Sequence, residues 1–240
     1  MELPVKINIC PIVDAVMEIR FNAKVHSNAI FGMIYSNLRH DYQDVEKLPI
    51  LQLPEQLRDS DSTFKFKPQY KIKSESGYTV QIGPNVVIIG SEIPYSGWNN
   101  FKEKISEILK SIFNSDMGIV VNRLGLRYIN FFELDALERI NLEISVNSPL
   151  KLESPTIIRT SVPLNGYSNN LQLANGVERL VKDNSLNGSI IDIDTYKEYV
   201  DTSFENDYMS EIERAHSVEK ELFFSLLKPE FLQELKPEYD

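Results

Sequence analysis

The chain has 240 residues, 42% of them hydrophobic, which suffices for one large domain or two packed lobes and argues against disorder. Its 35 acidic and 25 basic residues give a net charge of −10 without a cluster of Lys and Arg, so general nucleic-acid binding is not expected. A single cysteine, Cys10, excludes an internal disulfide, and three scattered histidines offer no zinc-finger spacing.

The first residues lack the apolar run of a signal peptide. No apolar segment approaches the roughly 20 residues that a membrane-spanning helix needs. We therefore expect a soluble cytoplasmic protein with no membrane association.

The first predicted elements are a strand, a helix and a connector. Residues 12–21 alternate between apolar and polar side chains, which indicates a half-buried strand. Residues 27–40 carry an apolar stripe at helical spacing, and Ser27 or Asn28 is the expected N-cap. Residues 41–62, rich in proline and polar side chains, are expected to form a connector.

Three strands follow in the predicted order. Alternation resumes at residues 64–72, with Pro68 at an edge or bulge. Residues 78–82 alternate, residues 83–85 form a turn, and residues 86–89 are a short apolar strand.

A helix and a strand complete the predicted first half. The helix opens around residues 95–98, with Ser96 as its expected N-cap. A strand is expected at residues 123–131. The helix buries the apolar side chains Trp98, Phe101, Ile105, Ile108, Leu109 and Ile112, which recur every three or four residues.

The second half is predicted to begin with strands. Residues 141–146 alternate, and residues 157–162 are expected to form a strand. A hairpin is expected to join residues 170–174 to residues 177–181 across Asn175-Gly176.

The remaining elements are a strand and a long helix. Asn187-Gly188 is expected to turn the chain into a strand at residues 189–194. A helix is expected at residues 207–227, and Pro229 and Pro237 punctuate the segment after it.

This order of elements predicts an α+β fold. We expect two packed lobes, each a mostly antiparallel sheet with helices, that pack as one globular unit. The N-terminal lobe would comprise residues 1–132 and the C-terminal lobe residues 133–240.

Asp192 and Asp194 are two residues apart on a predicted strand, so both carboxylates project from one face. Such a pair could share a hard cation such as Mg²⁺. The alternative, which we favour, is a solvated edge strand whose charges discourage aggregation. The sequence names no third ligand and no cofactor.

Glu18 and Arg20 are same-face neighbours on one predicted strand, as are Arg123 and Arg127 on another. If these strands share a sheet, the four side chains could bind a phosphate or carboxylate group, which arginine grips bidentately. The alternative, slightly favoured, is a ladder of cross-strand salt bridges.

Trp98, the only tryptophan, is either an exposed anchor for a protein partner or, as we favour, a packing contact between its helix and the sheet. His216 lies in the last predicted helix without a paired nucleophile, and we expect a structural hydrogen bond there. Common nucleotide-binding and hydrolase motifs are absent from the sequence, so an enzyme is not the favoured interpretation.

Six segments carry a family resemblance: residues 11–21, 80–86, 95–98 with Phe101, 123–130, 191–194, and Ala215-His216. In this order they resemble a sporadically distributed family of bacterial proteins whose function is not established. The resemblance spans nearly the whole chain, although the connector at residues 41–62 and residues 133–180 carry no matching motif. It implies no activity or cofactor, but sporadic distribution suggests mobile cargo such as phage-defence or toxin–antitoxin loci.

The leading hypothesis is a non-enzymatic regulatory protein that binds a protein partner, because the acidic folded chain lacks catalytic and nucleic-acid motifs. The alternative is a phosphate- or nucleotide-binding protein or a metal-dependent enzyme that uses the arginines and carboxylates named above. Recognition of an RNA end by the arginines is the least favoured hypothesis. Whether the chain forms a homo-oligomer stays open.

Overall fold

The computed structural model describes residues 3–143, 155–181, 184–200 and 203–239, and its fold is α+β as predicted. Nine strands follow the hydrogen-bonding order β3-β4-β5-β6-β2-β7-β10-β9-β8, and β1 pairs with β11 in a second sheet. The residues group into two compact units, which are described separately. Unit 1 comprises Met1–Val13, Arg127–Thr195 and Arg214–Asp240, and unit 2 comprises Asp14–Leu126 and Tyr196–Glu213.

These units differ from the lobes expected from the sequence. Each unit gathers segments from both halves of the chain. The strands β7 (Val120–Phe132) and β10 (Asn184–Glu198) each contribute residues to both units. The predicted division into consecutive lobes at residue 133 therefore stays a prediction.

Unit 2 is built on an antiparallel sheet, and its strand Ile12–Asn22 alternates between buried and partly exposed side chains. Met17 pairs with Ile89, and Ile89 pairs with Val80, so three apolar side chains lie side by side on one face. All three are fully buried. The strands are β2 (Ile12–Asn22), β3 (Tyr42–Lys47), β4 (Tyr70–Ser74), β5 (Tyr78–Gly83) and β6 (Val86–Ser91).

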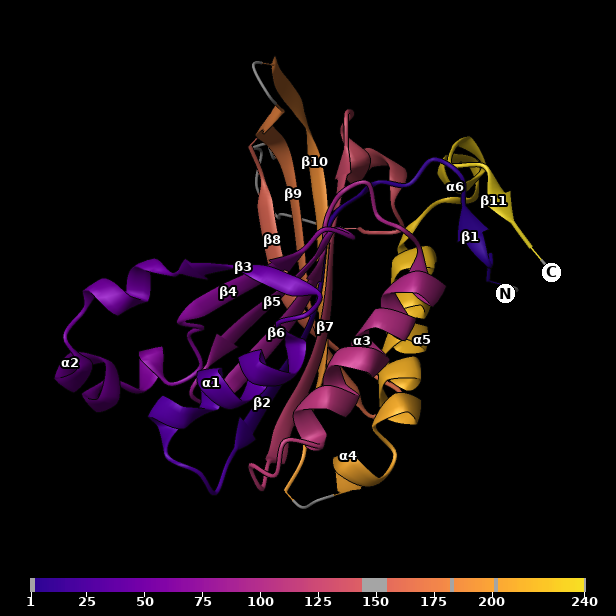
Figure 1. The fold of residues 1–240 in the computed structure, drawn as a ribbon. Helices are drawn as coiled ribbons and strands as arrows, with labels where there is room; N and C mark the ends of the chain where they lie inside the picture. Colours follow the sequence, from indigo (N-terminus) through magenta and orange to yellow (C-terminus); the bar gives the residue numbers. More distant parts are fainter. Residues whose placement is uncertain (1–2, 144–154, 182–183, 201–202, 240) are drawn as a thin grey trace. The chain divides into compact units, whose positions relative to one another are not determined.

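Helices α1 (Ser27–Leu38) and α3 (Trp98–Phe113) pack against one another in unit 2, and α1 also contacts β5 (Figure 1). Both helices lie where apolar spacing predicts them, and the apolar stripe of α3 is buried from Phe101 to Ile112. Trp98, at the first position of α3, is only partly buried.

The predicted N-caps of both helices are wrong. His26 caps α1, since its Nδ1 accepts a hydrogen bond from Asn28 N at 3.3 Å. Gly97 caps α3 with a positive φ of 91°, a conformation that glycine adopts without steric cost. Ser96 instead shares a hydrogen bond between its hydroxyl and that of Tyr78 at 3.0 Å.

The predicted connector at residues 41–62 contains regular structure. It holds the edge strand β3 and the short helices η1 (Pro49–Gln52) and α2 (Glu55–Ser60). The strand predicted from residue 64 begins only at Tyr70, because a 3₁₀ turn, η2 (Ser62–Phe64), occupies the chain before it.

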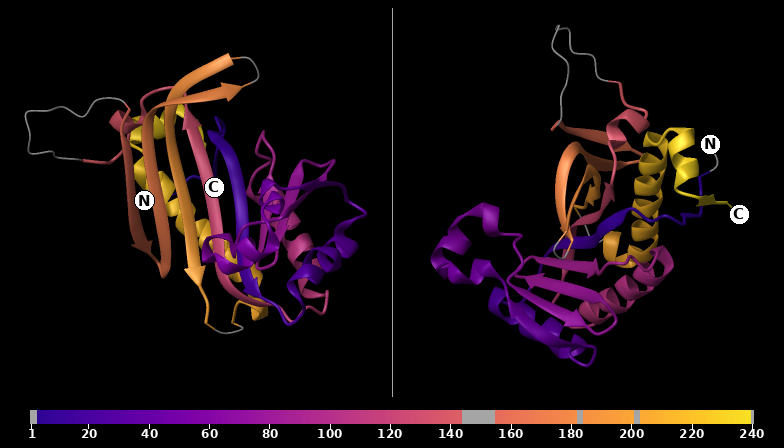
Figure 2. Two further views of the ribbon diagram at one scale, coloured as in Figure 1. Left: turned by 90° about the vertical axis from the view of Figure 1, so that its left-hand side faces the viewer. Right: turned by 90° about the horizontal axis from the view of Figure 1, so that it is seen from above.

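Unit 1 contains neighbouring strands with helices on one face (Figure 2, left). The strands β9 and β10 and the helices α5 and α6 bury a shared apolar core that includes Leu173, Ile193 and Phe231. The elements are the end of β7 (Val120–Phe132), η3 (Ala136–Arg139), β8 (Ile157–Leu164), β9 (Tyr167–Val181), β10 (Asn184–Glu198), the C-terminal part of α5 (Tyr208–Leu226), and α6 (Pro229–Glu234).

The two turns predicted at Asn-Gly pairs in this unit are wrong. Strand β9 runs continuously through Asn175-Gly176, and β10 runs through Asn187-Gly188. The hairpin turn lies instead at Asn165-Gly166, where both residues have positive φ, 49° and 80°. This conformation matches the tight turn that Asn-Gly favours between antiparallel strands.

Tertiary contacts explain why the other two pairs do not turn. Asn175 N donates to Thr156 O at 3.1 Å, and Thr156 N donates to Asn175 Oδ1 at 2.7 Å, which holds the strand against its neighbour. At Gly188 an added Cβ would lie 2.0 Å from Phe132 O, so glycine serves close backbone packing there.

The remaining elements are short. Lys6–Ile7 (β1) pairs antiparallel with Pro237–Glu238 (β11), and helix α4 spans Ser203–Asn206. The strand predicted at residues 141–146 is absent at 141–143, and 144–146 lie outside the described residues. Among the helices that the structure describes, none has the length and apolar content to cross a membrane.

Candidate functional site

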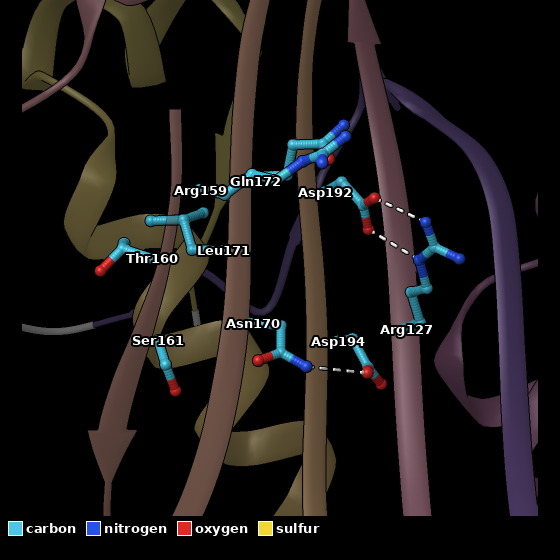
Figure 3. A pocket seen from close by; sticks show the side chains of 9 residues that line it. All are labelled: Arg127, Arg159, Thr160, Ser161, Asn170, Leu171, Gln172, Asp192 and Asp194. Atoms are coloured by element: carbon cyan, nitrogen blue, oxygen red, sulfur yellow. Dashed lines mark hydrogen bonds and ion pairs between the residues drawn. The ribbon is translucent and has the colours of Figure 1, made fainter. Parts of the chain in front are cut away.

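A polar pocket of about 460 Å³ lies on the strands of unit 1 (Figure 3). Alternation places the apolar side chains of β9 and β10 in the core, with Leu171, Leu173, Ile191 and Ile193 almost fully buried. The intervening side chains project from the other face. The pocket is lined chiefly by Arg127, Arg159, Asn170, Gln172, Asp192 and Asp194.

The strongest contact in this pocket joins Arg127 of β7 to Asp192 of β10. Arg127 Nε donates to Asp192 Oδ1 at 2.8 Å, and Nη2 donates to Oδ2 at 2.6 Å. This bidentate geometry is the arrangement in which a guanidinium holds a carboxylate best. The Asp192 side chain is 11% exposed and that of Arg127 is 45% exposed, so the pair presents mainly its arginine to the pocket.

The rest of the pocket is also held by hydrogen bonds between neighbouring strands. Arg159 Nε donates to Gln172 Oε1 at 2.6 Å, and Asn170 Nδ2 donates to Asp194 Oδ2 at 3.4 Å. The pocket therefore presents charges of both signs on side chains whose positions are restrained before anything binds.

A second polar cluster lies in unit 2, where Glu18 accepts from two arginines. Arg20 Nε and Arg123 Nη1 donate to the same carboxylate oxygen, Glu18 Oε1, at 2.7 and 2.6 Å. The guanidinium of Arg20 lies 4.8 Å from the ring of Phe66, and that of Arg123 lies 4.4 Å from the ring of Tyr196. Aromatic faces attract and orient a guanidinium in this way.

The residues predicted to hold an anion thus fall into two groups. Glu18, Arg20 and Arg123 lie together in unit 2, whereas Arg127 pairs with Asp192 in unit 1. Convergence of all the predicted arginines and carboxylates on one ligand stays a prediction.

The predicted metal pair has a different environment from the one expected. Asp192 is engaged by Arg127, a cation that neutralises the charge a metal ion would need. Within the part of the chain that the structure describes, no group of three or more His, Cys, Asp and Glu side chains could hold a metal ion. A metal at Asp192 and Asp194 stays a prediction without a third ligand.

Trp98 links helices within unit 2. Its Nε1 lies 3.2 and 3.3 Å from the two carboxylate oxygens of Glu213, to which it donates, and Lys102 Nζ lies 2.8 Å from Glu213 Oε2. The ring packs edge-on against Phe101, with 6.4 Å between centroids. Trp98 is therefore a contact between α3 and the first turns of α5, and its predicted role as a partner anchor stays untested.

Helix α5 carries a partly buried histidine and a buried carboxyl. His216 packs near Tyr128, with ring centroids 6.1 Å apart. Glu219 is 5% exposed, and burial raises the pKa of its carboxyl from 4.5 to about 8. Sequence reasoning missed Glu219, although its position, four residues after Ala215 and three before Leu222, falls within the apolar stripe.

Sequence reasoning also missed Arg159, Asn170 and Gln172. The signal was present, because polar side chains alternate with apolar ones on both sides of Asn165-Gly166, a hairpin sequence. Placing the hairpin at the wrong Asn-Gly pair concealed this pattern.

No protein-family model matches the chain, and no curated protein matches it. Functional inference therefore depends on the geometry of the two polar clusters and on the surfaces around them.

Proposed function

We propose that the protein is a non-enzymatic regulatory protein that binds a polar segment of a partner protein in the pocket lined by Arg127 and Asp192. The observation that carries the proposal is the restrained, mixed-charge lining of this pocket. Complementary charges fix specificity at protein interfaces. A role in a defence or toxin–antitoxin system is part of the proposal only through the family resemblance.

The test exchanges the two charges of the central pair. A double variant, Arg127→Asp with Asp192→Arg, keeps an ion pair but reverses the position of each charge. The control exchanges Arg139 and Glu234, a half-exposed arginine–carboxylate pair of the same unit, joined at 2.6 Å.

Affinity purification from the native host, followed by mass spectrometry, compares the three proteins. We expect a stoichiometric protein partner with the unchanged chain and with the Arg139/Glu234 exchange, and its loss with the Arg127/Asp192 exchange. Equal recovery by all three proteins, or recovery of no protein partner, would refute the proposal. The same samples are assayed for retained small molecules and metals.

A second candidate function is binding of a phosphate or carboxylate group by Arg20 and Arg123. Glu18 holds the guanidinium groups of Arg20 and Arg123 beside one another, which supports it, because arginine side chains grip phosphate and carboxylate groups. Calorimetric titration with inorganic phosphate tests it. Glu18→Gln should strengthen phosphate binding by removing the competing carboxylate, and absence of binding to both proteins would exclude this function.

A further inference from the structure

Strand β8 forms the outer edge of the sheet in unit 1 and pairs with β9 on one side only. In an antiparallel pair, alternate residues direct their N–H and C=O groups toward the neighbouring strand. The hydrogen bond from Asn175 N to Thr156 O identifies the even-numbered residues as those that face β9, because the register continues unbroken along the pair.

The odd-numbered residues of β8 therefore turn their backbone groups outward. The outward donors are the N–H groups of Ile157, Arg159 and Ser161, and the fourth outward position is Pro163, which has no N–H. Proline is tolerated in a strand where its missing N–H would face away from the sheet. Within the described part of the chain, no strand lies beyond this edge.

The other edge of the nine-strand order is built differently. Strand β3 carries an irregularity in register between Tyr42 and Asp44, and its exposed side chains include Glu46 and Lys47. Bulges and charges of this kind prevent a sheet edge from pairing with another chain. Strand β8 has only one charged side chain, Arg159, and a regular register along its whole length.

We propose that two copies of this chain associate by pairing their β8 strands antiparallel, with Thr160 at the two-fold axis. In this register Arg159 lies opposite Ser161 of the other copy, and Ile157 lies opposite Pro163 of the other copy. Each outward N–H of one strand meets an outward carbonyl of the other. Such pairing is isologous, because the same edge serves both copies.

The charge on β8 disfavours one neighbouring register. A shift that placed Arg159 opposite itself would bring two like charges together, which destabilises a cross-strand pair. With Thr160 at the axis, each Arg159 faces an uncharged serine instead. The edge is thus complementary to itself in its backbone groups and opposes no like charges, which favours a second copy as its occupant.

The dimer would also extend the polar pocket. Arg159 and Ser161 line the pocket in one copy and lie on the edge that would pair (Figure 3). Pairing would bring Arg159 and Ser161 of the other copy beside them, so each pocket would be completed by residues of both chains.

The first test measures the mass of the purified chain by light scattering over a concentration series. We expect the mass to rise from the 27.6 kDa of one chain toward twice that value. The N–H of Ser161 points outward and makes no hydrogen bond to β9. Ser161→Pro removes this N–H and should weaken association at least about tenfold. Ser161→Ala keeps the N–H and should associate as the unchanged chain does.

The second test fixes the register with cysteines. Residues opposite one another at a non-hydrogen-bonded position have Cα atoms about 4.5 Å apart, within reach of a disulfide. In a background of Cys10→Ser, Thr160→Cys should therefore cross-link two copies under mild oxidation. Ile158→Cys is the control, because its partner would be Val162 of the other copy and not itself.

A third test uses charge at the axis. Thr160→Lys and Thr160→Glu should each be monomeric because like charges meet, and their mixture should dimerise. A chain that is monomeric at every concentration would overturn the proposal. This outcome would also be expected if a strand of a different protein pairs with β8. A dimer that resists Ser161→Pro and is not cross-linked through Thr160→Cys would form elsewhere and would also overturn it.

Discussion

Glu219 makes the stability of the protein depend on pH in a direction opposite to that of most carboxyls. Burial raises its pKa in the folded protein to about 8, against 4.5 for an exposed glutamate. Between these values the folded protein keeps a proton that the unfolded chain releases. The unfolded chain then binds fewer protons, so the free energy of unfolding falls as pH rises.

The magnitude follows from the size of the shift. Each pH unit between the two pKa values removes about 1.4 kcal/mol, so about 3 kcal/mol is lost between pH 4.5 and pH 7. Glu219→Gln has a similar shape and does not titrate, so this loss should be absent from the variant. Its stability relative to the unchanged chain should therefore grow by about 2–3 kcal/mol between pH 5 and pH 7.

Urea denaturation of both proteins at pH 5, 6, 7 and 8, followed by circular dichroism, measures this difference. The readout is how the stability difference between the two proteins changes with pH. A difference that is constant with pH would report only how well the glutamine amide packs. Glu103→Gln, an exposed position on α3, is the control and should show no such trend. A stability difference between Glu219→Gln and the unchanged chain that is the same at every pH would refute the protonated state of Glu219 in the folded protein.

Three further substitutions, with Gly32→Ala as the control for the first, test the contacts described above by chemical denaturation. Gly188→Ala should lower the free energy of unfolding by more than about 4 kcal/mol or prevent folding, because its Cβ would meet a backbone carbonyl. Gly32→Ala, whose Cβ would have no atom within 4 Å, should stabilise α1 by up to about 1 kcal/mol. Equal effects of the two substitutions would contradict the close approach at Gly188. Asp192→Asn should cost about 1 kcal/mol, less at high salt, because the Arg127 side of the ion pair is 45% exposed although Asp192 is only 11% exposed. A loss independent of salt would count against that. Trp98→Phe keeps an aromatic ring, although a smaller one than indole, and deletes the donor to Glu213. It should cost at least about 1 kcal/mol, followed by circular dichroism. An unchanged midpoint would show that the hydrogen bond is not needed.

Local patterns predicted the elements whose formation depends on local burial. Alternation located β2 and β5 to within about two residues, a short apolar run located β6 equally well, and helical spacing located α3. Each of these segments has one face that must be buried wherever it packs. The α+β class follows from their order and needed no knowledge of which strands are neighbours.

Features that depend on distant segments were not predictable in this way. Asn175-Gly176 has a strong local preference for a turn, but hydrogen bonds to Thr156 keep it in a strand. The same limit applies to the site. Alternation placed Asp192 on a polar face, but its partner, Arg127, depends on β7 and β10 being neighbours, which is a property of the whole sheet.

The pairing of β1 with β11 has a consequence for the order in which unit 1 can form. Val5 N donates to Glu238 O at 2.7 Å, so residues near the two ends of the described chain depend on one another. During synthesis the first of these segments emerges long before the second, and contacts between such distant segments slow folding. Unit 1 therefore cannot be completed until α6 and β11 have been made. Until then the apolar faces of its strands and the side chain of Ile7 remain uncovered.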